Sequence, residues 1–198
     1  MKGVLLAGGT GSRLHPLTRI TNKHLLPIYD RPMINWGIEA LVNAGITEIM
    51  LVTGGTHAGE FLRLLGNGHE FGIDRLSYGY QDRPGGIAEA LGLAARFVDG
   101  DPVLVMLADN IVEKPEHPAS KFGVTGIYCY DADVFDVIPT LVPSGRGELE
   151  ITDVNNHYIA QGAMAYDVLE GFWGDAGESI DAYYTVNDFV RKHGANKG

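Results

Sequence analysis

Near its start the chain reads Val4-Leu5-Leu6-Ala7-Gly8-Gly9-Thr10-Gly11-Ser12-Arg13, an apolar run that ends in a glycine-rich turn. The apolar run predicts a buried strand. Glycines allow sharp backbone bends, and they let backbone N–H groups approach an anion without a Cβ in the way. Arg13 and, ten positions later, Lys23 add positive charge where phosphates would lie. The stretch therefore predicts a polyphosphate site, with Gly8, Gly9, Thr10, Gly11 and Ser12 as its nucleotide-binding residues.

Two other phosphate-binding motifs do not fit this turn. The dinucleotide fingerprint needs a third glycine where this chain has Leu14, and a Walker A loop needs Gly-Lys-Ser/Thr, which the sequence lacks. The missing glycine, together with the Arg13 and Lys23 pair, also argues against a dinucleotide-dependent oxidoreductase. A glycine-rich turn after a strand is a weak signal when taken alone, and a purely structural turn is the alternative.

The composition is that of a globular protein with one domain or at most two. The chain has 198 residues, of which 45% are hydrophobic and 20% charged. The net charge of −10 argues against a nucleic-acid partner. The single cysteine, Cys129, excludes a disulfide framework, and its apolar surroundings predict a buried core residue. Neither a signal peptide nor a membrane span is apparent, so we expect a cytoplasmic protein without a membrane partner.

Strand and helix patterns alternate along the chain. Strands are predicted over residues 46–52, 76–80, 102–107, 124–130 and 163–169. Helices are predicted over residues 33–44, 57–65, 87–97, 134–138 and 180–192. This alternation predicts an α/β protein with a doubly wound, mostly parallel sheet and helices on both faces, as in a Rossmann-like fold.

Three polar segments follow strands of this predicted sheet. They are Gly8 to Arg13, Gln81 to Gly86, and Asp109-Asn110. Ligands of open α/β sheets bind beyond the carboxyl ends of the strands, so the shared position predicts a single site. A carboxylate such as Asp109 at a strand end suits Mg²⁺ beside phosphates, although an Asx turn that ends the strand is the alternative.

Several motifs resemble those of the sugar-1-phosphate nucleotidyltransferases, most closely the short form of the glucose-1-phosphate thymidylyltransferases. They are Gly8 to Leu14 with Pro16-Leu17-Thr18, Asn22 to Pro27, Glu113-Lys114-Pro115, Arg146 to Asp153, and Phe172 to Gly177. The resemblance extends from Met1 to about Val190. It implies a nucleotidyltransferase fold and an enzyme that converts dTTP (or UTP) and glucose 1-phosphate into a nucleoside diphosphate sugar and pyrophosphate. It also implies Mg²⁺ as cofactor and a homo-oligomer.

The resemblance assigns roles to individual residues. Arg13 would stabilise the leaving pyrophosphate, and Lys23 would bridge the α-phosphate and the incoming sugar phosphate. Gln81 would read the base edge through its side-chain amide and Gly86 through its backbone. The sugar-phosphate side would consist of Glu113, Lys114, Val124 and Arg146. Asp109 and Asp175 would bind the metal ion.

The sequence departs from this family at one point. Asp109-Asn110-Ile111 is followed almost directly by Val112-Glu113, whereas the family has several dozen residues between the equivalent motifs. Either the protein lacks this segment or the numbering closes over it, and the second explanation is the simpler one. We predict one domain over residues 1–198, with a nucleotide-binding half (1–111), a sugar-phosphate and metal half (112–198), and the gap between 111 and 113. The alternative function is a catalytically impaired module that binds a nucleotide sugar.

Overall fold

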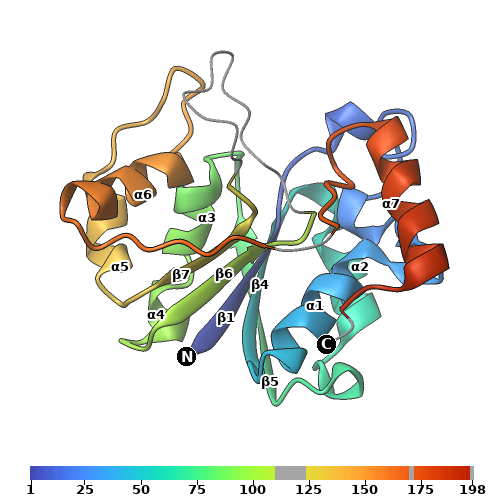
Figure 1. Cartoon of the computed structure of the whole chain (residues 1–198), viewed down its shortest axis with the longest axis horizontal. Helices are drawn as coiled ribbons and strands as arrows, with labels where there is room; N and C mark the ends of the chain where they lie inside the picture. Colours follow the sequence, from blue (N-terminus) through green and yellow to red (C-terminus); the bar gives the residue numbers. More distant parts are fainter. Residues whose placement is uncertain (110–123, 170–171, 197–198) are drawn as a thin grey trace.

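A computed structural model describes residues 1–109, 124–169 and 172–196. Its centre is a five-stranded sheet in the order β5-β4-β1-β6-β7 (Figure 1). The strands are β1 (Lys2–Ala7), β4 (Glu48–Gly54), β5 (Arg75–Gln81), β6 (Val103–Leu107) and β7 (Ile127–Tyr130). Strands β5, β4, β1 and β6 are parallel neighbours, and β7 is antiparallel to β6. The predicted mostly parallel sheet is confirmed.

Helices cover both faces of the sheet, which confirms the doubly wound architecture (Figure 1). On one face lie α1 (Met33–Asn43) and α2 (Ala58–Leu65), and on the other lie α3 (Ile87–Gly92), α4 (Ala95–Val98), α5 (Val134–Val137) and α6 (Ile151–Ala160). Strand β1 supplies both cores, because successive side chains of a strand point to opposite faces. Leu5 packs in the cluster of α1 and α2, whereas Val4 packs in the cluster of α3 and α6.

A third, smaller core supports the loops that follow the glycine-rich turn. Helix α7 (Ile180–His193) packs on the short hairpin of β2 (Pro27–Ile28) and β3 (Arg31–Pro32). Buried side chains from the turn, the hairpin, the start of α1, α7 and the segments beside them meet there, namely Leu14, Leu26, Ile28, Met33, Ala176, Tyr183 and Val190. Within the described residues, 3-10 turns lie at Ser12–Leu14, Lys23–Leu25, Gly55–His57, His69–Phe71 and Ile138–Thr140. Within the described ranges, no helix has the length and apolar character that crossing a bilayer requires.

Three expectations from the sequence are wrong. Residues 163–169 form no strand, and Tyr166 and Val168 are 90% and 60% exposed. A strand needs a partner for its hydrogen bonds, and in the described part of the chain none pairs with this segment. The predicted helix 87–97 is broken at residues 93–94 into α3 and α4. Cys129 is exposed rather than buried, because it points to the face of the edge strand β7 opposite to that of the buried Tyr130.

Candidate active site

The glycine-rich turn adopts a backbone that side chains would obstruct. Gly9 and Gly11 have φ values of 93° and 62°, in the left-handed region that favours glycine. A Cβ on Gly11 would lie 3.0 Å from Thr18 Cγ2 and 3.2 Å from Lys23 Cβ. The Thr18 hydroxyl donates a 2.7 Å hydrogen bond to the Gly11 carbonyl. The turn is therefore held close to the segment that carries Lys23.

A buried ion pair joins this turn to the end of β6. The Lys23 ammonium bonds the Asp109 carboxylate, although 86 residues separate them, and both side chains are almost fully buried. Asn22 accepts the backbone N–H of His24 at 2.9 Å and so caps the 3-10 turn that carries Lys23. His24 Nε2 lies 3.8 Å from Asp109 Oδ1, while its Nδ1 donates to Asn22 Oδ1 at 2.9 Å. Residues 22–24 therefore form a rigid support that presents positive charge to Asp109.

Burial and the neighbouring groups shift the pKa values of two side chains in this cluster. Burial acts to raise the pKa of Asp109, but His24 and the Lys23 ammonium outweigh it and hold the pKa well below its ordinary value. Burial lowers the pKa of His24, and the neighbouring Lys23 acts in the same direction. Asp109 therefore remains a carboxylate, an oxygen ligand suited to a cation.

Asp175, which the family resemblance implies as the second metal ligand, lies in the same cluster. It is 6% exposed, and its Oδ1 accepts the Gly177 N–H at 2.7 Å. Burial raises its pKa to about 6, and the negative charge of Asp109 acts in the same direction. A Cβ on Gly177 would come within 2.5 Å of Asp109 Oδ2, so the Asp175 turn lies directly against Asp109.

The pair of carboxylates fits a divalent metal ion. Mg²⁺ takes few protein oxygens and completes its coordination with phosphate and water. The raised pKa of Asp175 shows that its charge is poorly compensated, and a cation shared with Asp109 would offset that cost. Among the described residues, no group of three or more His, Cys, Asp and Glu side chains could hold a metal ion, so these two would act together with a ligand.

A methyl group at Gly177 tests this packing. We expect Gly177→Ala to displace the Asp109 carboxylate, because no room exists for a Cβ beside it. The Mg²⁺ concentration needed for half-maximal activity should rise by about tenfold, as for other changes that reorient ligating groups. Gly145→Ala is the control, since a Cβ there meets nothing within 4 Å. An unchanged Mg²⁺ dependence in Gly177→Ala would contradict the predicted metal role of Asp109.

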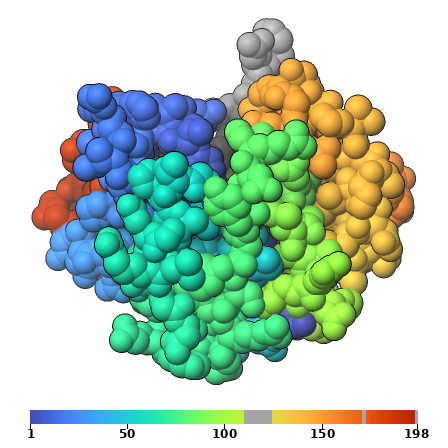
Figure 2. Space-filling model, turned by 180° about the vertical axis from the view of Figure 1, so that it is seen from behind, coloured from blue at the N-terminus to red at the C-terminus, as the bar shows by residue number. Residues whose placement is uncertain are grey.

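The predicted base-reading loop faces the glycine-rich turn. A Cβ on Gly8 would lie 3.5 Å from Gln81 Oε1, at the end of β5. Gly86 has a φ of 94°, and a Cβ there would come within 2.3 Å of the Leu149 carbonyl oxygen. Hydrogen bonds from Leu149 N to Gly85 O and from Ala88 N to Leu149 O tie the loop to the start of α6. Figure 2 shows the blue N-terminal residues and the green residues after β5 facing each other on the upper part of the molecule.

The other predicted residues that the structure describes lie outside the buried cluster of Lys23, Asp109 and Asp175. Arg13 is exposed on the 3-10 turn Ser12–Leu14, open to an incoming ligand. Arg146 Nη2 bonds both Glu150 carboxylate oxygens, at 2.9 and 3.0 Å, so Glu150 competes with a phosphate for this guanidinium. Val124 is 59% exposed. Glu113 and Lys114 lie outside the described residues.

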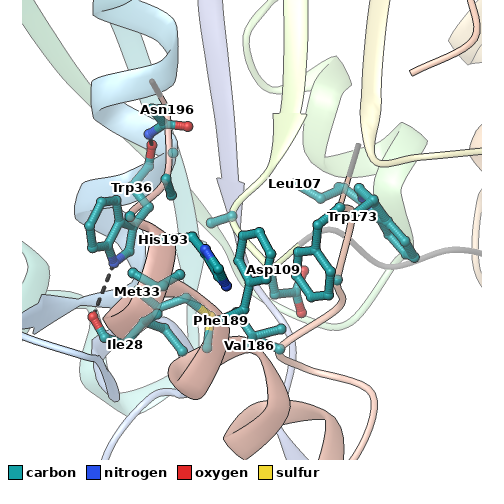
Figure 3. Close-up of a pocket in the computed structure, with 18 of the residues that line it drawn as sticks. Ile28, Met33, Trp36, Leu107, Asp109, Trp173, Val186, Phe189, His193 and Asn196 are labelled. Carbon is teal, nitrogen blue, oxygen red and sulfur yellow. Dashed lines mark hydrogen bonds between the residues drawn. The ribbon is translucent and has the colours of Figure 1, made fainter. Parts of the chain in front are cut away.

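A mostly apolar cavity of about 390 Å³ reaches Asp109 from the side of α7 (Figure 3). Its walls include Trp36, Trp173, Phe189 and His193. Trp36 Nε1 donates to the Ile28 carbonyl at 3.2 Å, so its indole is held against the hairpin. Trp173 Nε1 is buried and has no hydrogen-bond partner within the described residues. The cavity therefore approaches Asp109 from other elements than the glycine-rich turn does.

Sequence reasoning missed the supporting residues of the site. A structural role is all that the sequence indicates for His24, it indicates none for Asn22, and the close approach of Gly177 to Asp109 is seen only in the structure. The Asp-x-Gly spacing was a usable signal for Gly177, because a glycine beside a predicted ligand often marks a close approach. No local pattern indicates that His24 faces a residue 85 positions away.

A turn that can cradle phosphates, together with buried charges of both signs at the carboxyl ends of parallel strands, is typical of enzymes that use nucleoside triphosphates. The chain belongs to the nucleotidyl transferase family, whose model matches residues 2–112 and 108–193.

The similarity to named relatives is more specific. The chain is 39% identical to the glucose-1-phosphate thymidylyltransferase of Actinoplanes sp. over 239 residues, covering 96% of this chain and 78% of that protein. A protein from Bacillus anthracis, whose crystal structure was solved in complex with sucrose, is 40% identical in sequence to this chain. The two structures superpose with a TM-score of 0.90, and the match covers 100% of this chain and 97% of that one. UDP-glucose pyrophosphorylase complexed with UDP-glucose shares the fold, with a TM-score of 0.79 at 20% identity over 96% of this chain and 98% of that one.

Proposed function

We propose that this enzyme transfers a thymidylyl group from dTTP to glucose 1-phosphate, forming dTDP-glucose and pyrophosphate. The observation that carries the proposal is the convergence of Lys23, Asp109 and Asp175 in one buried cluster beside the glycine-rich turn. The named activity of the Actinoplanes relative supports the choice of thymidylyl group and sugar. UTP remains the alternative nucleotide, since the two bases differ by one methyl group and a pocket discriminates such a difference weakly.

The proposed reaction needs no protein nucleophile. A phosphate oxygen of glucose 1-phosphate bonds to the α-phosphorus, and the bond from that phosphorus to the oxygen of the leaving pyrophosphate breaks. The protein must align two polyanions and stabilise the charge that develops. Lys23 would contact the α-phosphate and the sugar phosphate, and exposed Arg13 would contact the β- and γ-phosphates. Backbone N–H groups of Gly8 to Ser12 would bind phosphate oxygens.

Asp109 and Asp175 would hold a Mg²⁺ ion, which when bound neutralises phosphate charge and polarises the α-phosphate. On the sugar side, Glu113 would accept hydrogen bonds from hydroxyls, Lys114 would bind the phosphate, and Val124 would contact the ring. Arg146 would add a phosphate contact in competition with Glu150. The cytoplasmic location and the homo-oligomeric state stay predictions.

A second function has one observation in its favour. The alignment with the Actinoplanes enzyme spans 239 positions, which is 41 more than the 198 residues of this chain. The two stretches matched by the family model meet at residues 108–112. A chain without the corresponding segment would lack part of the sugar pocket and could act as a nucleotide-sugar binding module instead. The domain division at this point likewise stays a prediction.

Pyrophosphate release distinguishes the two functions. We expect release from dTTP only when glucose 1-phosphate and Mg²⁺ are both present, and we expect EDTA to abolish it. UTP in place of dTTP measures the base preference. Binding of dTDP-glucose without any release, by a folded protein with a measured mass of 21.4 kDa, would instead establish the binding module.

A further inference from the structure

The amide group of Gln81 has a single chemically sensible orientation. Its Nε2 donates to the Gly86 carbonyl at 3.2 Å and to Glu89 Oε1 at 3.1 Å. A backbone carbonyl and a carboxylate can only accept hydrogen bonds, so the amide nitrogen must face them. The amide oxygen therefore faces the other way, toward Gly8, where a Cβ would lie 3.5 Å from it. Gln81 offers an acceptor, not a donor, to the space beside the glycine-rich turn.

The Glu89 carboxylate that fixes this orientation is itself confined. It projects from α3, its side chain is only 25% exposed, and Arg83 Nη2 bonds its other oxygen at 3.1 Å. A Cβ on Gly85 would lie 1.9 Å from Glu89 Oε1, so the carboxylate lies directly against the Gly85 backbone. Three neighbours, Gln81, Arg83 and Gly85, thus hold the carboxylate in one place.

We propose that Glu89 determines base specificity by locking the Gln81 amide with its oxygen toward the ligand. The locked site accepts a nucleobase that presents an N–H donor at the edge facing Gln81, as uracil and thymine do at N3. Cytosine presents an acceptor at N3, and the two acceptors would repel. Glu89 acts through Gln81, so it is a positioning residue. The inference rests on the proposed role of Gln81 as the base reader.

Rotation of the Gln81 amide shows why Glu89 is needed. A free amide could turn by 180° and offer its NH₂ group to cytosine N3. In this structure the turned oxygen would face the Glu89 carboxylate and the Gly86 carbonyl, and two hydrogen bonds would become two repulsions. A glutamine at position 89 removes the carboxylate's part of that barrier, because its side-chain amide can either donate or accept, and only the repulsion from the Gly86 carbonyl remains.

The test compares two nucleotides that differ only at the base edge. dUTP and dCTP share their sugar and phosphates, and neither has a 5-methyl group. In wild type we expect kcat/KM for dUTP to exceed that for dCTP, and in Glu89→Gln we expect this ratio to fall on the order of tenfold. The fall should come mainly from KM, because Glu89 does not touch the reacting phosphates. Glu48→Gln is the matched control, since Glu48 also pairs with an arginine, Arg75, but at the opposite end of the sheet.

An unchanged ratio in Glu89→Gln, with transferase activity intact, would overturn the lock and leave the proposed function standing. If wild type releases pyrophosphate from no nucleotide, the proposed function fails, and calorimetric binding of dUTP and dCTP tests the lock by itself. Tighter binding of dUTP that is lost in Glu89→Gln supports it, whereas an equal preference in both proteins overturns it. Binding of neither nucleotide overturns the lock as well.

Discussion

Replacing Lys23 with methionine lowers kcat for pyrophosphate release by about a hundredfold or more. Methionine keeps the length of the side chain but removes the ammonium that lies between the glycine-rich turn and Asp109. Charge that develops at the α-phosphate would lose its nearest protein cation. We expect KM for dTTP to change much less than kcat, because the interaction strengthens in the transition state. Steady-state kinetics at saturating Mg²⁺ measure both constants.

The same substitution destabilises the protein by about 3–5 kcal/mol, because it leaves the buried Asp109 carboxylate without its partner. Lys2→Met separates the two effects. Lys2 pairs with Asp101 at 3.2 Å and donates to the Phe97 carbonyl at 2.9 Å, at the end of β1 opposite the turn. That variant should lose stability and keep kcat. If Lys23→Met also keeps a near-normal kcat, the catalytic role assigned to Lys23 is wrong.

Local sequence patterns correctly predict those parts of the fold that depend only on residues close together in the sequence. The apolar run before Gly8 forms β1, and the following glycines adopt φ values that other residues avoid. The failures share the opposite cause. Residues 163–169 have a strand-like composition, but pairing depends on a neighbour that the sequence pattern does not specify. Cys129 is exposed on one face of the edge strand β7 while Tyr130 is buried on the other, and which face is covered depends on the packing of distant helices.

The candidate site divides in the same way. Lys23 and Asp109 can be predicted because each lies in a recognisable motif. The carboxyl ends of parallel strands meet at one edge of the sheet, so the sequence also predicts a shared site. Other contacts depend on how side chains from different segments pack together. They are the Lys23–Asp109 ion pair, the contact of Gly177 with Asp109, and the hydrogen bond between Gln81 and Glu89. Sequence periodicity does not specify such side-chain contacts, so only the structure reveals them.

Replacing Asp175 with asparagine has opposite effects on stability and on activity. The Asp175 pKa of about 6 lies above its ordinary value of 3.8, so the folded protein binds an additional proton between those two pH values. Stability of the metal-free protein therefore falls as pH rises through this window, and the cost remains fully present above it. Asparagine carries no charge and can still accept the Gly177 N–H. In EDTA at pH 7, Asp175→Asn should be more stable than wild type by about 2–3 kcal/mol, and near pH 4 the two should match.

Activity should change in the other direction. Asparagine is a poorer Mg²⁺ ligand than a carboxylate, so kcat should fall about a hundredfold and more Mg²⁺ should be required. Added Mg²⁺ with dTTP should raise the melting temperature of wild type more than that of the variant, since only binding to the folded state stabilises. Asp136→Asn, an exposed position on α5, should change neither quantity. Lower stability of Asp175→Asn in EDTA would show that the carboxylate serves the fold. A gain in stability with a loss of activity is the result expected of a charge retained for a metal ion.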